Sequence, residues 1–215
     1  PAIIVQKTVV GGFVPSCTAP GAELYMNVAG VDVTYCYLVE NSGDTDLCDV
    51  KLMDAEDGFP AGGIDCGCLK VGESKYCTPF TTEIPSSVQP PTGSELEVTA
   101  TGNPVDGDGN DLPDLEDVSD SDPAGVKPIT PSVSVEKKVT EVGVPCDSGV
   151  EMLTGPPGTG VEFCYRVTNT GDTNLCVMIE DTEDGYPAGG VDCGCLEPNE
   201  SAYCPPFVST IPTAP

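Results

Sequence analysis

The chain has 215 residues, with 8 basic and 35 acidic side chains, no His, no Trp and a formal net charge of −27. This charge disfavours nucleic acid and anionic membrane surfaces as partners and makes cations the natural counterpart. No apolar stretch approaches the roughly 20 residues of a membrane-spanning helix, so the sequence predicts no membrane span. Aromatic residues make up only 6% of the chain, which predicts a thin hydrophobic core.

Alternating apolar residues predict β-strands through the first part of the chain. The clearest run places Val31, Val33, Tyr35, Tyr37 and Val39 on one face, and turn residues follow at 41–44. No apolar period of 3.6 persists over three turns, so we expect an all-β fold. The predicted strands are, in chain order, residues 3–10, 31–39, a strand beginning at Leu47, 75–80 and 95–101, followed by an acidic loop at 105–122.

The second part of the chain repeats the first. Residues 33–48 and 161–176 match closely, with the sequences VTYCYLVENSGDTDLC and VEFCYRVTNTGDTNLC. Six cysteines recur in the same order in the two parts. The sequence therefore predicts two tandem β-sandwich domains, residues 1–128 with the acidic loop and residues 129–215. The predicted strands of the second domain are residues 133–139, 161–167, a strand beginning at Leu175 and 202–208.

The twelve cysteines predict a disulfide framework in an oxidising compartment. With no His and no matched C-x-x-C pairs, a zinc site is the weaker alternative. A hairpin turn at 69–74 brings Cys77 back toward Cys66 and Cys68, so we expect Cys77 to bridge one of these two. The remaining connectivity stays open, and the cysteines concerned are Cys17, Cys36, Cys48, Cys66, Cys68, Cys77, Cys146, Cys164, Cys176, Cys193, Cys195 and Cys204.

Two phrases occur in both copies and resemble a known family. They are P-x-[IV]-x-[VI]-x-K, at 1–7 and 131–137, and N-[ST]-G-D-T-x-L, at 41–47 and 169–175. Together with ELEVTATG at 95–102 and the Asp-rich segment after it, they are similar to the Ig-like repeat called domain of unknown function eleven. The resemblance implies Ig-like sandwiches in arrays, as in large secreted and surface proteins, and it brings no catalytic residues. Six cysteines per repeat depart from the plainer form and suggest a cysteine-reinforced branch.

The two copies differ in length. The second ends at Pro215, opposite Val88, so the counterpart of about forty residues is missing, including at least one strand. A sandwich without that strand exposes unpaired backbone groups and part of its core. We expect either later residues of a longer array or a strand donated by a neighbouring subunit to fill the gap. A shortened second fold is the third alternative, whereas the first two predict head-to-tail assembly.

The clearest pattern of metal-binding side chains lies in the acidic segment 106–117. Its oxygen-bearing side chains stand at positions 1, 3, 5, 9 and 12, the spacing of a calcium loop, and it resembles the loops of type-three thrombospondin repeats. Asp111 stands where an EF-hand requires Gly, and no helices flank the loop, so a solvated acidic loop is the alternative. The possible calcium ligands are Asp106, Asp108, Asn110, Asp114 and Asp117.

A second acidic cluster is duplicated and is the weaker metal candidate, with an exposed turn as its alternative. It consists of Asp54, Glu56 and Asp57 in the first copy and Asp181, Glu183 and Asp184 in the second. Paired carboxylates can serve a glycosidase, but neither an aromatic cleft nor a His or S-x-x-K base is evident. Asn199 begins a formal glycosylation sequon.

We therefore expect a non-enzymatic, extracellular or cell-surface structural protein, the repeat unit of a filament, stalk or coat. Its expected partners are copies of itself or adjacent repeats, through strand complementation of residues 129–215. No cofactor is expected apart from possible Ca²⁺, and no nucleic acid. A cell-surface adhesin or a calcium-dependent binding module is the alternative.

Overall fold

The structure is a computed structural model that describes residues 1–87 and 95–212. The chain forms two compact units, Pro1–Pro128 and Ile129–Pro215. Both are built of β-strands, and the described residues contain no α-helix and only one short 3-10 turn, Cys146–Ser148. The expected all-β class is confirmed. No helix in the described part of the chain is long and apolar enough to cross a membrane.

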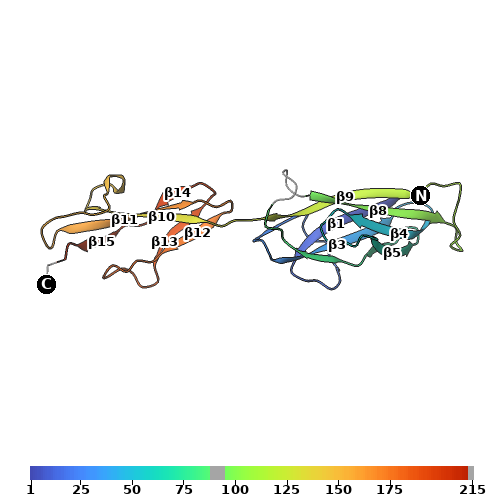
Figure 1. Ribbon diagram of the computed structural model, residues 1–215, viewed down its shortest axis with the longest axis horizontal. Coiled ribbons are helices and arrows are strands. Elements are labelled where there is room, and N and C mark those ends of the chain that lie inside the picture. Colours follow the sequence, from blue (N-terminus) through green and yellow to red (C-terminus); the bar gives the residue numbers. More distant parts are fainter. Residues whose placement is uncertain (88–94, 213–215) are drawn as a thin grey trace. The chain divides into compact units, whose positions relative to one another are not determined.

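Two sheets form the first unit (Figure 1). In the first sheet, β3 pairs antiparallel with each of the other strands, and its members are β1 (Ile3–Gly11), β3 (Asp32–Asn41), β6 (Ser74–Tyr76) and β7 (Phe80–Glu83). The second sheet has the order β2 (Leu24–Asn27), β9 (Val118–Pro128), β8 (Glu95–Val105), β4 (Asp46–Asp54) and β5 (Ile64–Leu69). Its strands are antiparallel except for β2 and β9, which run parallel.

The core of the first unit lies between these sheets. Alternate residues of β3 point inward, as do residues of β4 on either side of its register shift at 47–51, so that Val33, Tyr37, Leu47 and Leu52 have no exposed surface. Val98 of β8 is equally buried, which shows that the β8–β9 hairpin supplies part of this core. Aromatic rings line one end, where Phe59 meets Tyr37 and Phe80 edge to face.

The second unit repeats part of this arrangement. One sheet contains β10 (Val133–Glu141), β11 (Gly160–Asn169), β14 (Ser201–Tyr203) and β15 (Phe207–Thr210), and the other contains β12 (Leu175–Ile179) and β13 (Val191–Leu196). They correspond to the first sheet of unit one and to its β4–β5 pair. Among the described residues of the second unit, nothing corresponds to β2, β8 or β9. Its core is accordingly a cluster of five buried side chains with partly buried neighbours.

The shared N-[ST]-G-D phrase forms the same buried corner twice. The Asn41 amide is fully buried, donates to the carbonyls of Thr45 and Leu69, and accepts from the N–H of Gly43. Asn169 makes the corresponding hydrogen bonds in the second unit. The phrase therefore marks a satisfied polar group in the core, beyond its role as a turn.

Each unit contains three disulfides, and the two sets join equivalent cysteines. Cys77 pairs with Cys66, one of its two predicted partners, while Cys68 reaches Cys48. Gly67 between them has φ 71°, which lets the two neighbouring cysteines face different partners. The remaining bridges are Cys17–Cys36, Cys146–Cys164, Cys176–Cys195 and Cys193–Cys204.

Some predicted bounds were wrong. The strand expected at 75–80 is two short strands, β6 and β7, because Pro79 cannot donate to a ladder, and residues 202–208 are divided in the same way around Pro205 and Pro206. The acidic loop covers only 106–117, since residues 118–122 already belong to β9. The parallel strand β2 was not predicted.

Candidate functional site

The predicted calcium loop connects β8 to β9. Asp106 accepts hydrogen bonds from the backbone N–H groups of Asp108 and Asn110, each at 2.9 Å, and from the Asn110 side-chain amide. These bonds, led by the one from the Asn110 side chain, hold the pKa of Asp106 below its usual range. Asp114 and Asp117 are exposed further along the loop. Among the described residues, no group of three or more His, Cys, Asp or Glu is arranged to hold a metal ion, and calcium binding remains a prediction.

The second acidic cluster meets a lysine that sequence reasoning overlooked. Lys7 lies on the inward face of β1, and its Nζ is 3.0 Å from Asp54 Oδ1 and 3.0 Å from Glu56 Oε1. It also donates to the carbonyl of Leu96 on β8 at 2.8 Å. Asp57 is exposed and takes no part. Two of the three acidic residues therefore belong to a buried ionic cluster, and only one is part of an exposed turn.

Burial controls the charge of this cluster. The side chains of Lys7 and Asp54 have no exposed surface, and that of Glu56 is 10% exposed. Burial raises the pKa of Glu56 above its usual range, and the attraction of Lys7 opposes this only in part. Because one amine faces two carboxyls, a protonated Glu56 leaves the cluster neutral. Burial likewise raises the pKa of the Tyr37 hydroxyl, which donates to Asp54 Oδ2 at 2.7 Å.

The second unit contains the same three groups in a more open setting. Lys137 Nζ is 2.7 Å from Asp181 Oδ2 and 3.0 Å from Glu183 Oε1. The side chains of Lys137 and Glu183 are each 38% exposed. Desolvation lowers the pKa of Lys137, but its hydrogen bonds to Asp181 and Glu183 outweigh this and raise the value overall. The neighbouring Asp184 is exposed, like its counterpart in the first unit.

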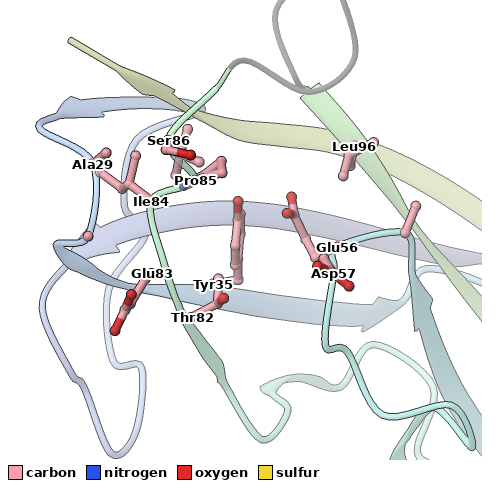
Figure 2. A pocket seen from close by; sticks show the side chains of 13 residues that line it. Ala29, Tyr35, Glu56, Asp57, Thr82, Glu83, Ile84, Pro85, Ser86 and Leu96 are labelled. Atoms are coloured by element: carbon pink, nitrogen blue, oxygen red, sulfur yellow. The ribbon is translucent and has the colours of Figure 1, made fainter. Parts of the chain in front are cut away.

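A pocket of about 460 Å³ lies beside the first cluster (Figure 2). Figure 2 shows Tyr35 and Glu56 at this pocket, with Ile84 and Leu96 also on its wall. Lys7 Nζ lies 4.4 Å from the centre of the Tyr35 ring. The ionic cluster is thus enclosed by an aromatic ring on one side and reaches a pocket through Glu56 alone.

The matching pocket of the second unit is larger, about 700 Å³. Phe163, Glu183 and Ile211 stand on its wall where the first unit has Tyr35, Glu56 and Ile84. Leu96 and Val126 of the β8–β9 hairpin also line the first pocket, and the described part of the second unit contains no equivalent of them. Within the described residues, these two side chains are a part of the first pocket's wall that the second unit lacks.

The edge of the first sheet also differs between the units. The N–H groups of Val5 and Lys7 donate to Asp120 and Asp122 of β9, at 2.9 and 2.7 Å. At the equivalent positions Val135 and Lys137, no described side chain accepts from the backbone N–H. The outer edge of β12, where β4 pairs with β8, likewise has no strand beside it within residues 129–212.

Asn199 is exposed in the turn between β13 and β14. This position is open to the attachment of a glycan, which remains a prediction.

Comparisons with protein-family models, with curated proteins and with solved structures found no match to this chain. The function of the chain is therefore inferred from its sequence and its own geometry. The residues that sequence reasoning missed, Lys7 and Lys137, had a visible signal. In P-x-[IV]-x-[VI]-x-K the lysine follows two apolar residues at a spacing of two, which places it on the inward face of the strand.

Proposed function

We propose that this chain is part of an extracellular structural protein whose Ig-like modules assemble head to tail as the repeat unit of a filament, stalk or surface coat. The six disulfides support a secreted location, because such bridges persist in oxidising compartments. Two modules of one pattern support a repetitive architecture. The resemblance to the Ig-like surface repeat points in the same direction.

The observation that carries this proposal is the uncovered face of the second unit. Val133 and Val135 are 51% and 62% exposed, whereas Ile3 and Val5 at the equivalent positions are 6% and 4% exposed. Both valines lie on β10, whose outer edge is open within the described residues, and the outer edge of β12 is open there as well. An apolar face between two open edges is the arrangement that an added β-hairpin covers.

The first unit indicates the chemistry of the segment that fits this face. Its β8 pairs antiparallel with β4, and its β9 turns Asp120 and Asp122 toward the N–H groups of β1. We therefore expect a hairpin with an apolar first strand and two alternate carboxylates on its second strand. The described residues contain one such hairpin, β8–β9, and it already covers the first unit. The corresponding face of the second unit therefore needs a hairpin from elsewhere. An adjacent repeat is thus a better donor than an exchange between identical chains.

A fusion tests this directly. Residues 89–128 appended after Pro215 would reproduce the connectivity of the first unit, since Pro215 corresponds to Val88. We expect the amides of Val135 and Lys137 to become protected from hydrogen exchange, and the second unit to unfold at a higher denaturant concentration. The matched control carries the same segment with both aspartates changed to Asn, and it should protect these two amides less. Unchanged exchange at both positions in the fusion would refute the proposed assembly.

A further inference from the structure

The buried cluster of the first unit brings an amine and a carboxyl into contact without water between them. Lys7 Nζ is 3.0 Å from Asp54 Oδ1, and both side chains have no exposed surface. The carboxyl is fixed from two further sides, because Tyr37 donates to Oδ2 and the N–H of Glu56 donates to Oδ1 at 3.2 Å. Reacting groups held this way have a high effective concentration.

We propose that Lys7 and Asp54 condense to an intramolecular amide bond, with Glu56 transferring the proton. The neutral Nζ of Lys7 attacks Cγ of Asp54, a C–N bond forms, and the bond from Cγ to one carboxyl oxygen breaks. The nitrogen loses one proton and the departing oxygen gains one, so that one water leaves. No oxidant, reductant or activated intermediate is needed, and Glu56 ends in the protonation state in which it began.

The cluster can hold the protons that amide formation requires. With Glu56 protonated, the ion pair of Lys7 and Asp54 can convert to a neutral amine and a neutral carboxylic acid without any change in total charge. Glu56 Oε1 is 3.0 Å from the nitrogen, within reach of the proton that must move. Burial raises the pKa of Glu56, which favours the protonated form that this exchange uses.

Burial also favours the product. An ion pair in a closed site carries a desolvation cost that a neutral amide does not, so exchanging one for the other is favourable there. The released water has an exit, because Glu56 is part of the wall of the adjoining pocket (Figure 2). The bond would join β1 to the end of β4, two strands in opposite sheets that none of the three disulfides of this unit connects directly.

The second unit provides an internal control. Its Lys137 reaches Asp181 at 2.7 Å, but the lysine side chain is 38% exposed. Water there stabilises the ammonium ion, so the neutral pair is rarely formed even though the side chain of Asp181 is only 11% exposed. We expect this cluster to remain an ion pair in the same molecule in which the first cluster has condensed.

Mass spectrometry of the full chain, reduced and denatured, tests the proposal. The expected mass is that of the sequence less one water. Trypsin should fail to cut after Lys7, and residues 1–51 should be recovered joined to residues 52–70. Lys7→Arg should restore the full mass, whereas Lys137→Arg should retain the deficit. Glu56→Gln keeps both reacting groups and should slow the bond formation by about a hundredfold.

Asp-Gly sequences can also lose water by forming a succinimide, and the chain contains such sites at 57–58, 106–107, 108–109 and 184–185. Hydroxylamine cleaves a succinimide but leaves a secondary amide intact, so the deficit should survive this treatment. A native chain of full sequence mass would overturn the proposal. So would a deficit that persists in Lys7→Arg or is lost to hydroxylamine. Normal bond formation in Glu56→Gln would overturn the role of Glu56.

Discussion

The first strands of the two units carry the same apolar pattern and bury it differently. Ile3 and Val5 are 6% and 4% exposed, and Val133 and Val135 are 51% and 62% exposed, although both strands pair with equivalent neighbours in the same register. The difference comes from the β8–β9 hairpin, which lies outside the repeated segment. A repeated motif can therefore encode the contact with a covering segment as well as the strand itself.

The ionic clusters show the same contrast in electrostatic terms. Lys7 has no exposed surface and also donates to Leu96 of the hairpin, whereas Lys137, with no such acceptor among the described residues, is 38% exposed. The lysine and the two carboxyls are identical in both units. The hairpin thus decides whether these groups form a buried cluster or a partly hydrated ion pair.

Reducing the disulfides should produce the largest effect. Each bridge stabilises by about 2–4 kcal/mol, and each unit has three. The core cluster of the second unit has five buried side chains among the described residues, against nineteen in the first, so the second unit should unfold while the first keeps part of its sandwich. Hydrogen exchange of the reduced and alkylated chain should show β11 unprotected and β3 still protected. An equal loss of hydrogen-exchange protection in β3 and β11 would contradict the expected difference between the two units.

Removing the two lysines should give the next largest difference. Lys7→Met leaves Asp54 and Glu56 buried without a cation and also prevents the proposed amide bond, so it should cost at least the roughly 3–5 kcal/mol of a broken buried pair. Lys137→Met should cost less, because the side chain of Glu183 is 38% exposed and can be hydrated, while that of Asp181 is 11% exposed. Denaturant titration of both variants, followed separately in each unit by hydrogen exchange, measures this. Equal losses would show that the hairpin does not isolate the first cluster.

Lowering the pH should change the stability of the two units in opposite directions. Hydrogen bonds from Lys137 and Tyr165 outweigh the opposing effect of desolvation and lower the pKa of Asp181 below 3.8, so the second unit should lose stability as the pH falls below that value. Burial raises the pKa of Glu56 above 4.5, so the first unit should gain stability as the pH falls through that raised pKa toward 4.5.

Thermal midpoints of the two units between pH 7 and pH 3 would show these slopes. Asp181→Asn should flatten the acid loss of the second unit and leave the first unit unaffected. A second unit whose midpoint is constant down to pH 3 would contradict the assignment.

Sequence patterns predicted the main strands because apolar residues alternate clearly in β1, β3 and their counterparts. They did not place the start of β9, whose first half reads VSDSD and falls within the predicted acidic loop 105–122. Its aspartates are paired with the N–H groups of a strand about 115 positions away, at Val5 and Lys7, which no local pattern can show. The buried cluster was missed for a related reason, since Glu56 is recognisable as a site residue only once Lys7 is placed opposite it.

Adding calcium should have the smallest effect on stability. We expect it only in the first unit, because the loop 106–117 has no counterpart between β12 and Pro212. Extracellular calcium modules bind at about 10⁻⁴–10⁻³ M, so millimolar Ca²⁺ should stabilise this unit by about 0.4–1.4 kcal/mol. Asp108→Asn with Asp114→Asn should abolish the gain and leave the Asp106 hydrogen bonds in place. The thermal midpoint of the first unit with Ca²⁺, with EDTA and with Mg²⁺ measures it. If Mg²⁺ stabilises as well as Ca²⁺ does, or the double variant still responds, the acidic loop acts only as a solvated charge cluster, and the two units differ by their hairpin alone.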